Sequence, residues 1–386
     1  MKNWKGVLAI LLMSVLSLGF GLPAFAAETD ALQLKSKSAV LMDAGTGTIL
    51  YEKNSHEAMP PASVTKVMTL LPIYEAEAAG QFGWEETVQV SEHAASMGGS
   101  QVFLEPGETQ TAAELTKCIA IASANDAAVA MAERLAGSEE TFVTKMNKKA
   151  QELGMTATTF KNCTGLPDEG HLSTARDVAK MSRELLKHKD YFTWSTTWMD
   201  EIRHEKDGRV TELVNTNKLI RSLAGCDGLK TGSTSEAKFC ITTTAKRGDM
   251  RLISVVLGGS TSALRFEDAA KLINYGFANF ENRSVVSAGE QLDIKIPLNK
   301  GIEKEIGVTA AQGFSVCVAN DGSEVVETRI EVPENIEAPV VRGQVVGRMI
   351  ITLDGTEIAS VDLLADNDYK KAGFIDRIKD IITFWK

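Results

Sequence analysis

Strand-like segments at both ends of a long helical middle constrain the fold of this chain most. Two strands are predicted at 38–43 and 48–51, around a turn at 44–47. Three more strand-like runs come late, around Leu213, at 239–245 and at 250–257. Helical spacing occupies 110–135, 138–153, 172–186 and 263–280. Such a chain most simply joins its ends in one antiparallel five-stranded sheet covered by helices, which predicts an α/β (α+β) fold.

A second, smaller domain is predicted after residue 283. From there to about 364 helical spacing is scarce, and 291–296 alternates apolar and polar residues with period two. Asp354-Gly355 lies between two apolar runs, which predicts a β-hairpin. We therefore expect a main domain over 27–283 and a small all-β domain over 284–368.

The first 26 residues have the pattern of a secretory signal peptide. Lys2 and Lys5 precede an apolar run at 7–22, and 23–26 resembles a small-residue cleavage site. Cleavage after Ala26 removes two lysines, so the formal net charge of −10 becomes −12. We expect export, and the alternative is an uncleaved N-terminal anchor.

The last segment, 369–386, predicts an amphipathic helix. Its apolar residues recur at helical spacing and are Phe374, Ile375, Ile378, Ile381, Ile382 and Trp385. Over 370–386 five basic residues face two acidic ones, and the segment is too short and too charged to span a bilayer. We expect it to lie in the outer face of the cytoplasmic membrane. Docking on the β domain is the alternative.

Composition excludes several other classes of function. A net-acidic chain without a long basic run argues against nucleic-acid binding. Five cysteines at irregular spacing form no disulfide framework, and the five histidines lack metal-ligand spacing. No G-x-x-x-x-G-K-[ST] loop occurs either. We expect neither a metal nor another cofactor.

The first motif with chemical meaning is Ser63-Val-Thr-Lys66, after the pair Pro60-Pro61. On a helix these two side chains share a face, so the lysine amine lies beside the serine hydroxyl. A serine needs an adjacent base to become a nucleophile, and burial can lower a lysine pKa enough for that role. A second S-x-x-K, at Ser235 and Lys238, falls in an expected strand, where its side chains would point to opposite faces.

Two further motifs follow in order. Ser123-Ala-Asn125 lies inside a predicted helix, where Ser123 can pass protons and the Asn125 amide can bind a peptide carbonyl. A bland polar helix face is the alternative for these two residues. Lys230-Thr231-Gly232 precedes the strand at 239–245 and offers a cation, a hydroxyl and a strand edge without a side chain. A simple turn is the alternative there.

The three motifs together, in this order, occur in class A β-lactamases and penicillin-binding proteins. Five longer segments resemble the D-alanyl-D-alanine carboxypeptidases, the low-molecular-weight penicillin-binding proteins, and these are 61–66, 123–127, 162–167, 227–232 and 250–258. The chain resembles those of Gram-positive spore formers most. The resemblance covers residue 35 to the C-terminus.

This resemblance implies a reaction and a set of roles. Ser63 would attack the carbonyl between the two terminal D-alanines of a peptidoglycan stem peptide, and Lys66 would take its proton. The same serine would be acylated by β-lactam antibiotics, which makes them covalent inhibitors. Ser123 and Lys230 would relay a proton to the leaving amine, while Asn125 holds the peptide.

The remaining implied roles concern substrate binding. The backbone N–H groups of Ser63 and Ser233 would form the oxyanion hole. Thr231 and Arg265 would hold the free carboxylate of the substrate, with Gly232 leaving room beside it. Arg265 on a solvated helix face is the alternative. Some relatives have histidine where this chain has Ser233.

Three rival functions share the same nucleophile. A class A β-lactamase also needs a glutamate in an E-x-x-L-N segment, and none occurs between Ser123 and Lys230. A D,D-endopeptidase would differ only in its larger leaving group. A non-catalytic penicillin-binding wall protein would be acylated without turnover.

Overall fold

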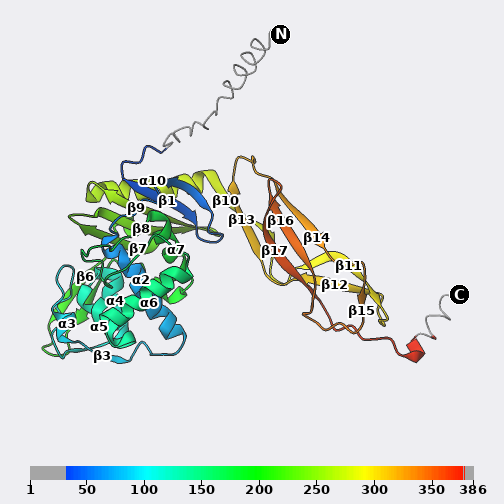
Figure 1. Cartoon of the computed structure of the whole chain (residues 1–386), viewed down its shortest axis with the longest axis horizontal. Coiled ribbons are helices and arrows are strands. Elements are labelled where there is room, and N and C mark those ends of the chain that lie inside the picture. Colours follow the sequence, from blue (N-terminus) through cyan, green and yellow to red (C-terminus); the bar gives the residue numbers. More distant parts are fainter. Residues whose placement is uncertain (1–31, 377, 379–386) are drawn as a thin grey trace, which may run out of the picture. The chain divides into compact units, whose positions relative to one another are not determined.

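The computed structural model describes residues 32–376 and Ile378, and Figure 1 shows their arrangement. Residues from Lys35 onward belong to one compact unit, and an N-terminal unit ends at Leu34. The predicted signal peptide and the last residues of the predicted C-terminal helix lie outside the described residues.

A five-stranded antiparallel sheet forms the centre of the first domain, with strand order β2-β1-β9-β8-β7. Its strands are β1 (Ser38–Asp43), β2 (Ile49–Lys53), β7 (Cys226–Thr234), β8 (Lys238–Arg247) and β9 (Met250–Gly259). Early and late segments of the chain therefore pair in one sheet. The prediction of an α/β fold that joins both ends is confirmed.

Sequence reasoning chose the wrong fifth strand. The run around Leu213 forms β6 (Val210–Val214), which pairs only with β5 (Met199–Arg203) in a separate hairpin. The fifth strand is β7, and Lys230-Thr231-Gly232 lies inside it, before β8, so the alternative of a simple turn is wrong. The polar residues and glycines of β7 hide the strand signal, because tertiary pairing rather than propensity makes it a strand.

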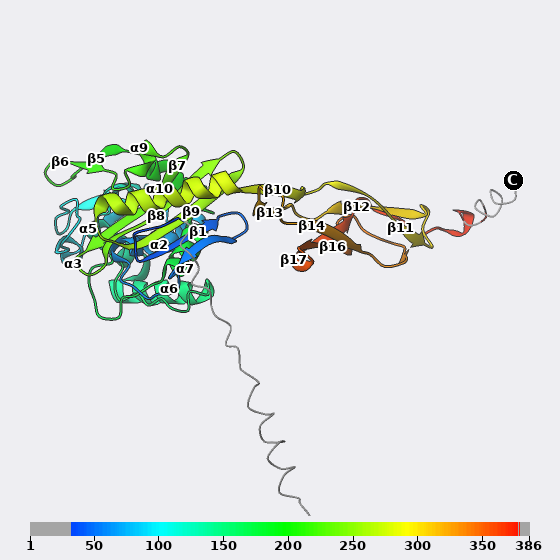
Figure 2. The ribbon, with the colours of Figure 1, turned by 90° about the horizontal axis from the view of Figure 1, so that it is seen from above.

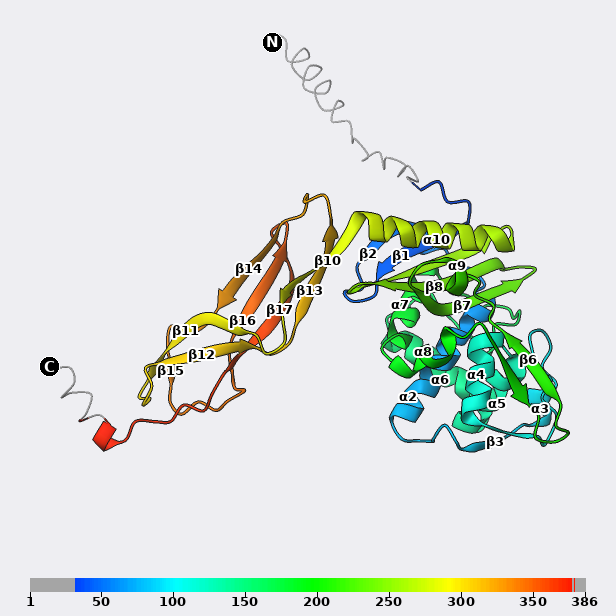
Figure 3. The same ribbon diagram turned by 180° about the vertical axis from the view of Figure 1, so that it is seen from behind.

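Helices cover both faces of the sheet. On one face α10 (Ser262–Asn279) lies across β8 and β9 (Figure 2). The opposite face carries α7 (Ala175–Leu185) and α2 (Lys66–Ala78) (Figures 1 and 3). Helix α2 is buried along most of its length, with every residue from 66 to 71 buried, and it thereby fixes the residues at its start.

The predicted helix over 110–135 is two helices, which corrects the expectation for the second motif. They are α4 (Ala112–Ala122) and α5 (Asn125–Ala136), and Ser123 between them has a left-handed backbone, with φ +64°. The helical spacing of apolar residues continues across this break, so the sequence pattern does not reveal it. The next helix, α6 (Glu139–Glu152), follows Gly137 as predicted.

Short elements complete the first domain. They are η1 (Ala62–Thr65), β3 (Thr87–Gln89), α3 (Glu92–Ala95), β4 (Thr109–Thr111), η2 (Lys189–Tyr191), α8 (Phe192–Ser195) and α9 (Leu219–Ser222). Ser235 lies in the turn before β8, not in a strand as expected, so the second S-x-x-K pair is no strand pair.

The segment between α10 and residue 373 forms only strands, turns and loops, as predicted for 284–368, whereas 374–376 are helical. Its six-stranded sheet has the order β14-β16-β17-β12-β11-β15, and β10 pairs with β13. These strands are β10 (Phe280–Val286), β11 (Gln291–Asn299), β12 (Glu305–Ala310), β13 (Phe314–Ala319), β14 (Val326–Glu331), β15 (Ile336–Glu337), β16 (Val345–Leu353) and β17 (Thr356–Ala365). Asp354 and Gly355 join β16 to β17 with positive φ at both residues, which is the predicted hairpin.

Candidate active site

Ser63 lies in η1, the 3₁₀ turn that leads directly into α2. The first residue of α2 is Lys66, and its Nζ lies 3.2 Å from the Ser63 Oγ. The turn is held from behind, because Thr65 Oγ1 and His171 Nε2 form a hydrogen bond of 2.8 Å. Burial lowers the pKa of His171 to about 4, so this imidazole stays neutral. The side chains of Ser63 and Lys66 are therefore in contact, as the motif predicts.

Lys66 is completely buried, and its surroundings suit a proton acceptor. Its Nζ donates to Asn125 Oδ1 at 2.5 Å and to the Thr164 carbonyl at 2.7 Å. Loss of solvent around the amine lowers the pKa of Lys66 from 10.5 to about 7. A large fraction of Lys66 is therefore neutral near pH 7, and a neutral amine can accept the serine proton.

The break between α4 and α5 places Ser123 and Asn125 at the same site. Asn125 begins α5, and its Nδ2 donates to the Gly98 carbonyl at 2.6 Å. An amide NH₂ group has two donors. The described residues supply one acceptor for them, so one donor remains for a substrate carbonyl.

In the second and third motifs, two buried side chains have polar atoms without partners within the described residues. Ser123 Oγ and Lys230 Nζ accept or donate no hydrogen bond there, although both residues are almost fully buried. Leaving such a group unpaired costs about 1–3 kcal/mol, so orphaned groups in one place indicate a site that a ligand or water completes. Desolvation and the nearby charges of Lys66 and Arg265 hold the pKa of Lys230 well below its usual value.

Gly232 brings strand β7 against the turn that carries the nucleophile. A Cβ at Gly232 would lie 2.7 Å from the backbone nitrogen of Ser63 and 2.9 Å from that of Val64. Only a residue without a side chain allows this approach. The backbone of β7 therefore borders the N–H groups of η1, and the exposed Ser233 follows directly in the strand.

Arg265 lies beneath β7 and not on a solvated helix face. Its side chain is 8% exposed, and Nη1 donates to the carbonyls of Gly232 at 2.9 Å and Cys240 at 3.3 Å. The guanidinium lies over the rings of Phe239 and Phe266. Its Nε has no partner among the described residues. Arg265 thus supports the third motif from behind and keeps a donor free.

Sequence reasoning missed the backbone groups that complete the site. In the segment 162–167 Asn162 Oδ1 accepts hydrogen bonds from the backbone nitrogens of Thr164 and Gly165. The resulting turn aims the Thr164 carbonyl at Lys66. A Cβ at Gly165, which has φ +81°, would lie 2.0 Å from the Ala62 carbonyl oxygen. The Asn-x-Thr-Gly pattern is the signal that marks such a side-chain-capped turn.

A second missed residue is Asp126, which follows the S-x-N motif. Its buried carboxylate accepts from the backbone nitrogens of Val102 at 3.0 Å and Leu104 at 3.1 Å. These bonds fix the loop whose Gly98 carbonyl binds Asn125. Burial raises the pKa of Asp126, while the backbone hydrogen bonds that its carboxylate accepts work against that shift.

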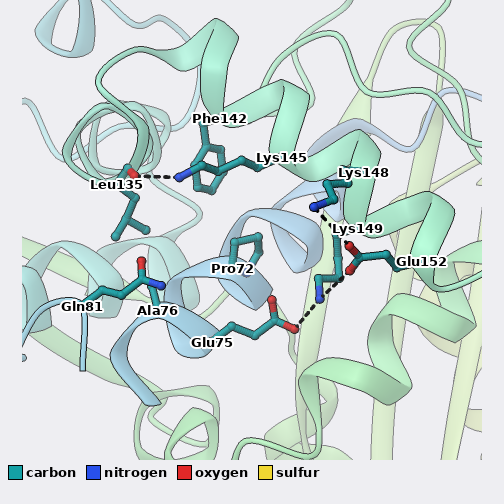
Figure 4. A pocket seen from close by; sticks show the side chains of 10 residues that line it. All are labelled: Pro72, Glu75, Ala76, Gln81, Leu135, Phe142, Lys145, Lys148, Lys149 and Glu152. Atoms are coloured by element: carbon teal, nitrogen blue, oxygen red, sulfur yellow. Dashed lines mark hydrogen bonds and ion pairs between the residues drawn. The ribbon is translucent and has the colours of Figure 1, made fainter. Parts of the chain in front are cut away.

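A cavity of about 330 Å³ lies elsewhere, between α2, α5 and α6 (Figure 4). Its charged groups mostly bind one another. Lys149 pairs with Glu75 and Glu152, and Lys145 donates to the Leu135 carbonyl. This cavity contains none of the predicted site residues. Among the described residues no cluster of His, Cys, Asp or Glu could hold a metal ion, and the five cysteines are free thiols.

Comparison with known proteins gives consistent matches over both domains. A family model described as D-alanyl-D-alanine carboxypeptidase matches residues 24–261, and one for the C-terminal domain of penicillin-binding protein 5 matches 280–371. The chain is 44% identical to D-alanyl-D-alanine carboxypeptidase DacF of Bacillus subtilis over 99% of each chain. It is 33% identical to DacC of Escherichia coli, over 94% of this chain and 92% of that one. The crystal structure of penicillin-binding protein 5 from Haemophilus influenzae superposes with a TM-score of 0.75 and 31% identity, covering 88% of this chain and 98% of that chain.

Proposed function

Because the chain belongs to the D-alanyl-D-alanine carboxypeptidase family, we propose that Ser63 is its nucleophile and Lys66 its general base. The chain is a serine-type carboxypeptidase that removes the terminal D-alanine. We infer that peptidoglycan pentapeptide stems are its substrates and that β-lactams acylate it, as the penicillin-binding relatives suggest. The 3.2 Å contact between Ser63 Oγ and the buried Lys66 Nζ carries the assignment.

In the proposed acylation step Ser63 Oγ attacks the carbonyl of the last peptide bond while its proton passes to neutral Lys66. The backbone N–H groups of Ser63 and Ser233 stabilise the negative oxygen of the tetrahedral intermediate. Ser123 and Lys230, whose polar atoms are buried without partners, pass a proton to the leaving amine of D-alanine. Water then attacks the acyl-enzyme, which releases the shortened peptide and restores the Ser63 hydroxyl.

The rate of acylation should depend on pH through the pKa of Lys66. Only neutral Lys66 accepts a proton, and the neutral fraction grows as pH rises through about 7. We expect the second-order rate of acylation by a chromogenic cephalosporin to rise about tenfold per pH unit below that pKa and to level off above it. Stopped-flow absorbance on the free enzyme measures this profile. A rate that is flat across pH 7, or that falls with rising pH, contradicts the role of Lys66.

Arg265 should distinguish a free chain end from an amidated one. We propose that its unpaired Nε, together with the Thr231 hydroxyl, binds the terminal carboxylate of the substrate. Losing a charge-assisted hydrogen bond costs about 1.5–3 kcal/mol, so Arg265→Ala should lower kcat/KM on a free D-Ala-D-Ala end roughly tenfold or more. Penicillins also carry a carboxylate and should lose acylation rate similarly.

The amidated peptide is the control for Arg265, because that substrate has no charge to lose. Arg265 also donates to the Gly232 carbonyl, so a purely structural role would lower kcat/KM equally on both substrates. Equal losses of kcat/KM on free and amidated substrates would therefore contradict the proposal that Arg265 binds the carboxylate.

We propose the domain organisation given by the sequence: a signal peptide over 1–26, a catalytic domain over 27–283, a β domain over 284–368 and an anchoring segment over 369–386. The end of α10 at Asn279 and the family match at 280–371 support a boundary in this region. The similarity to these relatives supports a function in the cell wall. We therefore propose that the enzyme lies on the extracytoplasmic face of the membrane. No helix within the described residues has the length and apolar character to cross a bilayer.

We propose that the membrane-contacting part of the anchoring segment begins after residue 372. Lys370 accepts a hydrogen bond from Ile302, and Ala372 donates one to Lys300, so 369–372 dock on the β domain. Beyond them Phe374 is 80% exposed and Ile375 is 68% exposed. Docking, the alternative considered for this segment, applies to its first residues, whereas the apolar side chains that follow lack a protein cover among the described residues.

Deleting 374–386 should therefore release the enzyme from membranes. The cut leaves the docked residues in place, so kcat/KM on a small soluble peptide should stay within about twofold of the parent. Ultracentrifugation of membrane fractions, with activity followed in pellet and supernatant, measures the result. A truncated enzyme that still pellets with membranes, or that loses its fold, shows that the segment is structural.

A further inference from the structure

One end of the β domain brings three separate segments together. Backbone bridges join Gly301 to Lys371 and Val340 to Tyr369, so 299–304, 338–343 and 369–376 are neighbours. We call these three segments the C-terminal end of the β domain, and Figures 1 and 3 show the chain leaving the domain there, beside β15. The loops before the anchoring segment and the segment itself thus share one surface.

Large apolar side chains are exposed on these loops. Val341 is 62% exposed and Ile302 is 47% exposed, and both lie next to the chain that continues to Phe374 and Ile375. Ile302 is held in place, since its backbone nitrogen donates to the Lys370 carbonyl. The exposed apolar surface of the anchoring segment therefore continues onto the folded domain.

The three segments themselves carry more basic than acidic residues. Their basic residues are Lys300, Lys304, Arg342, Lys370 and Lys371, against the acidic Glu303 and Asp376, which gives +3 on a chain of −10. Lys300 also pairs with Glu337, and Asp368 accepts a hydrogen bond from the Arg342 backbone nitrogen, so these two neighbouring carboxylates reduce the net charge of the end to +1. Basic residues around exposed apolar side chains are the composition of a surface that binds anionic lipid.

The opposite end of the domain has the reverse charge. There the turn at 354–355 meets 321–325, because Val325 and Asp354 exchange two hydrogen bonds of 2.9 Å. The stretches 321–325 and 354–358 carry four acidic residues and no basic one, a net charge of −4. Strand β17 separates the two ends by about 30 Å. The charge difference thus favours the C-terminal end of the β domain, rather than the acidic end, for contact with an anionic membrane.

We propose that the C-terminal end of the β domain is a lipid-contacting surface in its own right, with Ile302 and Val341 entering the headgroup region of an anionic membrane. This proposal rests on the proposed membrane attachment. The loops supply apolar contact beside Phe374 and Ile375, and the lysines and Arg342 lie among the lipid phosphates. The folded domain, and not only the terminal helix, then sets the distance and orientation of the enzyme at the membrane.

The test uses the full mature chain and vesicles of phosphatidylcholine mixed with anionic phosphatidylglycerol. The double variant Ile302→Ser/Val341→Ser should bind these vesicles about tenfold more weakly, because two apolar side chains no longer enter the interface. The matched control is Val325→Ser/Ile358→Ser at the acidic end, where Val325 is 55% and Ile358 is 40% exposed. It should bind within about twofold of the parent. Co-sedimentation measures binding, and turnover of a soluble peptide should be unchanged in both variants.

A tryptophan reporter gives a second, direct readout. Emission from Val341→Trp should be quenched by brominated lipids above the background of the parent chain, and emission from Val325→Trp should not. Equal weakening of binding in both double variants, or no weakening in the first, overturns the proposed surface while leaving the terminal helix as anchor. A parent chain that binds no anionic vesicle overturns the attachment itself, and the surface with it.

Discussion

Ser63→Ala should form no covalent adduct with penicillin, and its turnover of a D-Ala-D-Ala peptide should fall by roughly 10⁴-fold or more. Lys66→Arg should lose about 10³-fold in acylation rate, because a guanidinium does not give up its proton at neutral pH. Both side chains lie at the start of a deeply buried helix, so these losses come from chemistry if the variants keep their melting temperature. Stopped-flow acylation and circular dichroism measure the two quantities.

The second S-x-x-K pair provides the matched control. Lys238 is exposed and begins β8, and Ser235 lies in the turn before it. Lys238→Arg should acylate at the parent rate. If Lys66→Arg keeps its acylation rate, or Lys238→Arg loses it, Lys66 is not the base.

Gly232→Ala should cost about 10²–10³-fold in kcat/KM through a single added methyl group. That methyl would lie 2.7 Å from the Ser63 nitrogen, which is backbone and cannot rotate away. Strand β7 must then move from the turn, and the N–H groups proposed as the oxyanion hole no longer match. The substitution adds no strain in φ, so its effect is steric.

Gly83→Ala is the control for this substitution. Gly83 also lacks a positive φ, and a Cβ there would meet no atom within 4 Å. We expect parental kinetics from Gly83→Ala. A Gly232→Ala enzyme that is folded and within twofold of the parent would falsify the requirement for close approach.

Much of the fold follows from periodicity, and the errors have physical causes. The strands at 38–43 and 250–257 are apolar and buried on both faces, so their pairing was foreseeable. Strand β7 was not, because its polar residues face a site rather than a core. The break at Ser123 was hidden as well, since a left-handed residue need not be glycine when the surrounding packing holds it.

The sequence motifs predict most of the side chains of the candidate site, but they do not predict which backbone groups bind those side chains. Residue types at fixed spacing carry the chemistry of Ser63, Lys66 and Lys230. Every residue has a backbone carbonyl, so the sequence does not show that the Thr164 carbonyl binds Lys66. Only the fold places that carbonyl beside the Lys66 amine. Arg265 could be proposed from the resemblance, but its contact with the Gly232 carbonyl required the structure.

Mapping the site of penicillin attachment tests the central claim most directly. After incubation with labelled penicillin, the intact mass should increase by one penicillin per chain. Trypsin cleaves after Lys53 and Lys66, so the label should lie in peptide 54–66. Fragmentation should place it on Ser63, and not on Ser55 in the same peptide. A label on any other residue, or turnover of D-Ala-D-Ala peptides without acylation of Ser63, would contradict this account.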